Sequence, residues 1–161
     1  MYKIGYYERI KLLEPTDTWG GFQRCAELHY YRALCLMENG WLSGAVYHFG
    51  YVVELLLKAA IFRAAKFRPG DSVKKRSELS PGVIVILNHN LTELFRKLVS
   101  VRRLNQNPLP MDLIAQAQPR VEGMARNWSE VLRYRSIKAS PEETQAIYKR
   151  ATWFLTNHNH L

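Results

Sequence analysis

The chain has 161 residues, of which 47% are hydrophobic and 12% aromatic, and its formal net charge is +9. This length is typical of one domain that buries a core without disulfides, and the aromatic content argues against a disordered chain. The positive charge favours a polyanionic partner, with nucleic acid or a nucleotide as first candidate. The alternative is a basic domain without a specific anionic ligand.

The two cysteines are predicted to be reduced thiols. Cys25 and Cys35 are expected on one helix, where ten residues separate them by roughly 15 Å, too far for a disulfide. We expect them to be buried or half-buried, which suits a cytoplasmic protein. The first residues lead into a charged segment and give no secretory signal.

Residues 1–21 are predicted to form an N-terminal arm, and residues 22–161 a helical domain. Pro15 and the pair Gly20-Gly21 interrupt the arm, which is expected to dock through Trp19. Apolar residues at three- and four-residue steps predict a first helix over about 22–38, ended by Asn39-Gly40. Ser43 is expected to cap the next helix.

That next helix, from about 42 to 65, is nearly all apolar and is predicted to be the centre of the fold. Its β-branched residues would also suit a strand, but its length, its alanines and the Glu54–Lys58 spacing favour a helix. It is long enough to span a membrane. The polar residues His48, Glu54 and Lys58 near its middle favour a buried core helix, so no membrane partner is expected.

The remainder is predicted to alternate loops and helices. Residues 66–82 form a basic loop, residues 83–87 are too short to assign, and a helix covers about 90–101. A further helix covers about 111–134 and is interrupted or restarted near Pro119. Ser140 caps the last helix, which runs from Pro141 to about Thr156. The predicted fold is all-α, an antiparallel up-and-down bundle of four to five helices around the central helix.

From about Ala26 onward the sequence resembles the HEPN domains of prokaryotes. The matching pieces follow one another: a first helix ending in Asn-Gly, the segment 45–59, His89 before a helix, Trp128 with Arg133 and Tyr134, and a last helix that begins with acids. The resemblance implies a helical bundle that is usually dimeric. It also implies either RNA cleavage or a non-catalytic role, beside a nucleotidyltransferase or within a defence or stress system.

Catalytic members of that family carry an Arg and a His separated by four to six residues, and two such motifs meet across the dimer to cleave RNA without metal. The C-terminal half of this chain has no such pair, so the resemblance implies a non-catalytic member. Two imperfect candidates exist. Arg24 and His29 have the required spacing but lie on the first predicted helix, and Arg150 and His158 are separated by seven residues.

Glu54 and Lys58 are predicted to form an ionic joint inside the bundle. They lie one helical turn apart, and on so apolar a helix at least one charge is partly buried and needs a partner. Arg133 is the candidate for Glu54, because a guanidinium can bind a carboxylate through two hydrogen bonds. The alternative for Glu54 is a ligand-binding acid. We expect His89 to cap or pack a helix end and not to be catalytic.

Two groups of basic residues are candidates for phosphate or nucleic-acid binding, with Phe67 and Phe95 nearby to stack bases. The alternative is a solvated surface. The first group is Arg63, Lys66, Arg68, Lys74, Lys75 and Arg76, and the second is Arg96, Lys97, Arg102 and Arg103. No metal site and no cofactor are expected, because the cysteines cannot converge and no glycine-rich phosphate loop is present.

Three functions follow from the sequence. The first is a non-enzymatic, homodimeric helical module that binds a nucleotide, a nucleic acid or a protein partner such as a nucleotidyltransferase. The second is a metal-independent endoribonuclease with a displaced Arg/His site. The third is a structural assembly subunit that uses apolar helix faces.

Overall fold

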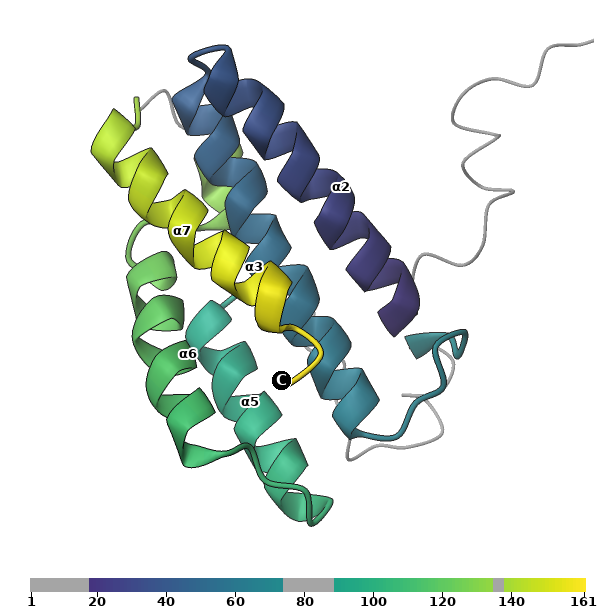
Figure 1. Cartoon of the computed structure of the whole chain (residues 1–161). Coiled ribbons are helices and arrows are strands. Elements are labelled where there is room, and N and C mark those ends of the chain that lie inside the picture. The colour runs from purple at the N-terminus through teal and green to yellow at the C-terminus, as the bar shows by residue number, and fades with distance from the viewer. Residues whose placement is uncertain (1–17, 74–88, 135–137) are drawn as a thin grey trace, which may run out of the picture.

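Five α-helices pack side by side in the computed structural model, which describes residues 18–73, 89–134 and 138–161, with only the main chain of Arg133 and Tyr134 (Figure 1). The described part contains no β-strand, and the predicted all-α bundle around a central helix is confirmed. The helices are α2 (Trp19–Glu38), α3 (Leu42–Ala64), α5 (Leu91–Leu104), α6 (Met111–Ala125) and α7 (Pro141–Asn157), with the short 3-10 helix η1 (Glu130–Tyr134) before α7.

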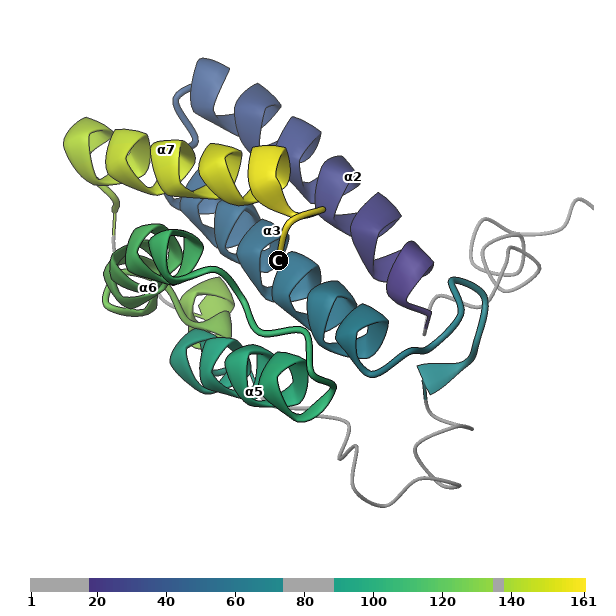
Figure 2. The same cartoon turned by 60° about the horizontal axis from the view of Figure 1, so that its bottom comes forward.

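Helix α3 is the centre of the bundle. It packs against α2, α5, α7 and η1, and Figure 2 shows it enclosed by its neighbours. By length and composition it could cross a membrane, but 72% of its most apolar stretch is buried inside the protein. The burial of α3 by other helices agrees with the predicted core helix.

The helices alternate in direction except that α3 and α5 run the same way (Figure 1). Helix α5 begins beside the middle of α3, because His89, two residues before α5, contacts Glu54 there. The start of α5 therefore lies near the middle of the bundle and not at one of its ends.

Side-chain caps explain where three helices begin. Thr18 accepts a hydrogen bond from the Gly21 amide, so α2 starts about three residues before the predicted boundary and inside the predicted arm. Asn90 caps α5, and Ser140 with Glu143 forms a capping box at α7, where the sequence predicted the Ser140 cap. Residues 1–17 of the arm and the segment 83–87 lie outside the described residues.

Ser43 does not cap α3, contrary to the prediction. The helix begins at Leu42 after Trp41, which makes no side-chain cap. Ser43 is the second residue of the helix, and its hydroxyl accepts a hydrogen bond from the Ala139 amide at 2.9 Å. A tertiary contact with the segment before α7 therefore takes the place of the local cap.

The predicted interruption of the fourth helix near Pro119 is also wrong. Helix α6 runs without a break from Met111 to Ala125 with Pro119 exposed inside it. The helix ends instead where Asn127 donates from its side chain to the Gly123 carbonyl. Trp128 then enters the core, and η1 follows.

Three apolar residues have surroundings different from those predicted. Phe67 is buried against Phe62 in a small second core, and its carbonyl accepts a hydrogen bond from the Trp19 indole, so it offers no ring face to a base. Cys35 is exposed, whereas Cys25 is half-buried, and both are free thiols. Phe95, the other ring expected to stack on a base, is likewise buried, at 5% exposure.

Gly50 allows the side chain of Trp128 to approach the main chain of α3 closely. A Cβ atom at Gly50 would lie 2.0 Å from Nε1 of Trp128, and that same nitrogen donates to the Tyr47 carbonyl at 2.9 Å. The indole therefore lies directly on the α3 main chain. Only glycine leaves room for it.

We expect Gly50→Ala to lower the free energy of unfolding by about 1–3 kcal/mol, because the added methyl group must displace a buried indole. Urea unfolding followed by circular dichroism measures the change. Gly70→Ala is the matched control, since a Cβ atom there meets nothing within 4 Å. Equal stability of the two variants would contradict this account of Trp128.

Candidate functional site

A cleft of about 600 Å³ opens between the start of α5 and the segment that joins α6 to η1. Polar side chains from both sides line it, which distinguishes it from the two smaller and more apolar cavities nearby. Its lining residues are His89, Asn90, Leu91, Thr92 and Arg96 on one side and Ala125, Trp128, Ser129 and Glu130 on the other. Its size is in the range of small-molecule sites.

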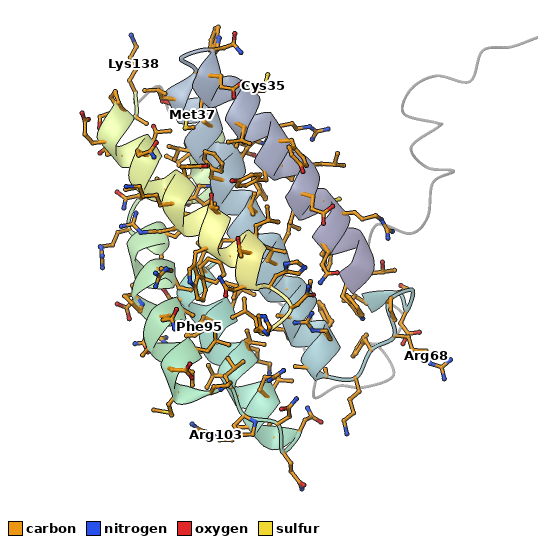
Figure 3. All side chains as sticks on the ribbon, viewed as in Figure 1. Cys35, Met37, Arg68, Phe95, Arg103 and Lys138 are labelled. Carbon is orange, nitrogen blue, oxygen red and sulfur yellow. The ribbon has the colours of Figure 1, made fainter. Side chains whose placement is uncertain are left out.

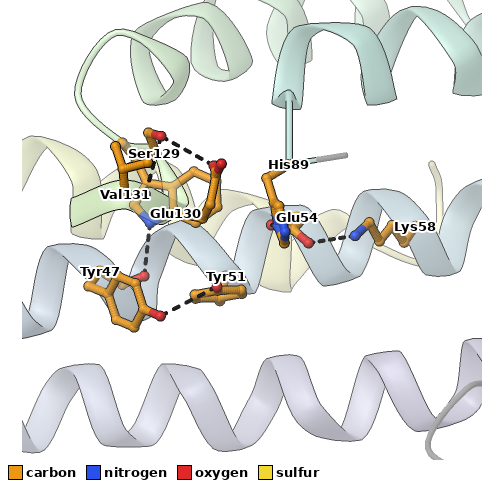
Figure 4. Close-up of polar contacts among 9 residues, drawn as sticks. Tyr47, Tyr51, Glu54, Lys58, His89, Ser129, Glu130 and Val131 are labelled. Carbon is orange, nitrogen blue, oxygen red and sulfur yellow. Dashed lines mark hydrogen bonds and ion pairs between the residues drawn. The ribbon is translucent and has the colours of Figure 1, made fainter. Parts of the chain in front are cut away.

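Beneath the cleft, Glu54 makes two charge-assisted contacts in the interior (Figure 4). Its side chain is 2% exposed, with Oε1 2.6 Å from Lys58 Nζ and Oε2 2.8 Å from His89 Nδ1. Each carboxylate oxygen therefore has a partner, as burial of this group requires. The prediction that Arg133 binds Glu54 stays a prediction, because that side chain lies outside the described residues.

His89 is oriented by this contact. A carboxylate oxygen can only accept, so Nδ1 of His89 carries the hydrogen atom and donates it to Glu54. The Nε2 atom makes no hydrogen bond with the described residues. Asn90, and not His89, caps the helix.

One face of α3 holds both walls of the cleft. Gly50 and Glu54 are one helical turn apart, and they receive Trp128 and His89 respectively. Trp128 is 4% exposed and hydrogen-bonded, so it closes the wall without presenting a stacking face. Two predicted family-motif residues, His89 and Trp128, thus meet at one site, while the side chains of Arg133 and Tyr134 lie outside the described residues.

The start of α5 and Arg96 make this cleft suitable for an anion. The first amides of a helix, here those of Leu91 and Thr92, have no partner within the helix, and the helix dipole adds positive potential. Arg96 follows one turn later, is exposed, and makes no ion pair or hydrogen bond among the described residues. On the opposite wall, Glu130 accepts a hydrogen bond from Ser129 at 3.2 Å.

Arg24 and His29 have different surroundings. Arg24 is exposed on α2, whereas His29 faces α3, where its Nδ1 lies 2.7 Å from Nδ1 of His48 and its ring stacks on Tyr51. Burial, together with His48 and Arg32, lowers the pKa of His29 to about 4. Burial and Arg32 also lower the pKa of His48. This is a neutral imidazole pair between two helices.

Arg150 and His158 also serve separate contacts. The Arg150 guanidinium lies against Gly123 on α6, where a Cβ atom would come within 2.7 Å of its Nε. His158 caps α7, and its Nδ1 is 2.6 Å from the Leu155 carbonyl. Arg150 and His158 therefore contact different parts of the bundle, and Nη1 of Arg150 is buried without a hydrogen-bond partner among the described residues. Among the described residues, no group of three or more His, Cys, Asp or Glu could hold a metal ion.

The described basic residues of the two predicted groups differ in their surroundings. Arg63 donates to the main-chain oxygens of His158 and Leu161 at 2.7 and 2.8 Å, and burial lowers its pKa, with Arg102 adding to the effect. Arg102 is half-buried, and its Nε lacks a partner among the described residues. The lysines and arginine at positions 74–76 lie outside the described residues.

The remaining members lie at the surface to different extents. Lys66, Arg68 and Arg103 are exposed, and Lys97 is half-buried. Arg68 and Arg103 project from the surface of the bundle in Figure 3. Among the described members of the two groups, Arg96 lines the cleft.

We expect Glu54→Ala to lower the free energy of unfolding by roughly 1–3 kcal/mol, because it leaves Lys58 and His89 without their acceptor. Chemical denaturation of the purified variant measures this. Glu27→Ala on the exposed face of α2 is the matched control. If both variants were equally stable, Glu54 would not be an architectural residue.

The His29–His48 pair predicts that stability falls as the pH drops from about 6.5 to about 4. In that window the unfolded chain protonates His29 near its ordinary pKa of about 6.5, whereas the folded chain resists until about 4. The unfolded state therefore binds more protons, and acid destabilises the fold. Urea unfolding across this range should show a shallower decline for His29→Gln than for the wild type. His160→Gln, at an exposed position, should keep the wild-type slope.

Comparisons with known proteins do not supply a function for the cleft. No protein-family model, no curated protein and no solved structure matches the chain.

Proposed function

We propose that the protein is a non-enzymatic helical module that binds a phosphate-bearing ligand, a nucleotide or a nucleic acid, in the cleft at the start of α5. The observation that carries the proposal is Arg96, which lines this cleft without a carboxylate partner among the described residues. An arginine without an ion pair beside a concave polar surface is a common way to bind phosphate.

Neighbouring groups support the same ligand chemistry. The amides of Leu91 and Thr92 at the start of α5 can donate to phosphate oxygens, and the Thr92 hydroxyl and His89 Nε2 lie on the same wall. The buried Glu54 does not offer its charge to the ligand, because both of its oxygens are bound by Lys58 and His89. The net charge of +9 adds a long-range attraction for polyanions.

The resemblance to HEPN domains supports a homodimer as part of the proposal, with a protein such as a nucleotidyltransferase as the alternative partner. Leu28 and Tyr31, 55% and 67% exposed, lie three residues apart on α2 and give that helix apolar surface for such a contact.

One observation favours a second function, metal-independent cleavage of RNA. The cleft contains both an Arg and a His, and a buried carboxylate orients the imidazole of His89. A carboxylate-oriented imidazole is a common general acid or base. This Arg96–His89 combination differs from the two pairs that the sequence suggested.

We expect Arg96→Ala to weaken binding of pyrophosphate and nucleoside monophosphates at least tenfold, measured by isothermal titration calorimetry at low salt. For a short single-stranded RNA, the plot of log affinity against log salt concentration should also become shallower by about one unit, because one phosphate contact disappears. Arg103→Ala, exposed on the same helix, is the matched control and should bind like the wild type.

Two results would contradict this proposal. If no phosphate-bearing ligand bound to the wild type at low salt, the cleft would not be an anion site. If labelled RNA were cut in the presence of chelator, and His89→Ala abolished the cutting, the second function would replace the first.

A further inference from the structure

A second cavity of about 240 Å³ continues the cleft along the groove between α5 and α6. Thr92 and Arg96 line both spaces, so the two are neighbours with Arg96 at their junction. The walls of the second cavity are mostly apolar, and its rim carries two polar side chains. The apolar members are Phe95, Val99, Ile114 and Val121, and the polar ones are Gln118 and Glu122.

The polar rim presents hydrogen-bond acceptors. Gln118 donates from Nε2 to Oε1 of Glu122 at 3.0 Å, and a carboxylate fixes this orientation because it can only accept. The amide oxygen of Gln118 and the second oxygen of Glu122 make no hydrogen bond with the described residues. The free positions of this pair therefore accept hydrogen bonds.

The groove thus combines three features in a row: an anion site, an arginine, and an apolar slot edged with acceptors. A flat aromatic group suits the slot, since apolar side chains from both helices face it. The acceptors favour a group that carries N–H donors on its edge. A phosphate on the same ligand would then contact Arg96 and the start of α5.

We propose that this groove binds a guanine nucleotide, with its phosphate in the cleft and its base between α5 and α6. The proposal rests on the function proposed above and specifies its ligand. Guanine presents two adjacent donors, N1–H and the N2 amino group, which match the two free acceptors, the Gln118 amide oxygen and the second oxygen of Glu122. Adenine and cytosine place an acceptor beside their amino group, and uracil places its one N–H between two carbonyls, so each meets Glu122 less well.

The same features argue against a peptide or a second copy of this chain as the occupant. A helix laid in a groove is held by apolar anchors at repeated spacing along it. Here the apolar slot is short, and Arg96 and Glu122 give its edges opposite charges. This arrangement suits a small ligand with an anionic end and a donor-bearing end.

The test is displacement of a fluorescent guanosine monophosphate from the full chain by unlabelled GMP, AMP, UMP and pyrophosphate at low salt. On the wild type, GMP should displace the probe at least about tenfold better than UMP, as expected for one matched pair of hydrogen bonds. Glu122→Gln should reduce this GMP-to-UMP preference to near unity, because an amide N–H₂ then faces a donor of the base. Competition by pyrophosphate should not change.

Glu27→Gln, exposed on α2, is the matched control and should keep the preference, and circular dichroism checks that each variant is folded. If GMP and UMP competed equally on the wild type while pyrophosphate still competed, the base site would be wrong and the phosphate site would stand. A preference for GMP that survived Glu122→Gln would also overturn this inference. If the probe did not bind at all, both the base site and the phosphate site would be wrong.

Discussion

The burial of one carboxylate organises the site. Glu54 lies in the middle of the most apolar helix of the chain with 2% exposure, and an unpaired charge there would cost several kcal/mol. Lys58, one turn along α3, satisfies one oxygen locally, but the other oxygen needs a group from a different element. His89 provides it and so ties the residue before α5 to the centre of the bundle. The cleft begins where this contact is made.

The opposite wall of the cleft depends on Gly50, which has no side chain. Gly50 lies one turn before Glu54 on the same face of α3, and the Trp128 indole occupies the space that a Cβ atom would fill. The buried charge of Glu54 and the space at Gly50 thus place His89 and Trp128, from two distant segments, against adjacent turns of α3. The exposed end of α5 with Arg96 follows from that placement. The position of the cleft is therefore a consequence of core packing, and a change of the core residues alters the site as well as the stability.

Local patterns in the sequence were enough to predict the bundle, its central helix and the Ser140 cap of α7, because apolar periodicity and capping residues act over a few positions. They were not enough for Ser43, whose hydroxyl binds an amide far along the chain, or for Phe67, which packs on Trp19 and Phe62. The site was partly visible: Glu54 with Lys58 came from helical spacing. The contact of His89 with Glu54 spans 35 positions and has no local pattern that would reveal it.

The distribution of positive charge explains why composition is a poor guide to the ligand surface. Arg63 belongs to the densest basic run, yet its guanidinium is bound to main-chain oxygens after α7, and burial lowers its pKa. Arg120 lies over the Trp153 ring. An arginine that holds the fold together contributes to the net charge as much as one that meets a ligand. Arg96 differs because it lines the cleft and makes no ion pair or hydrogen bond among the described residues, so it could exchange solvent for the proposed phosphate without breaking an internal contact.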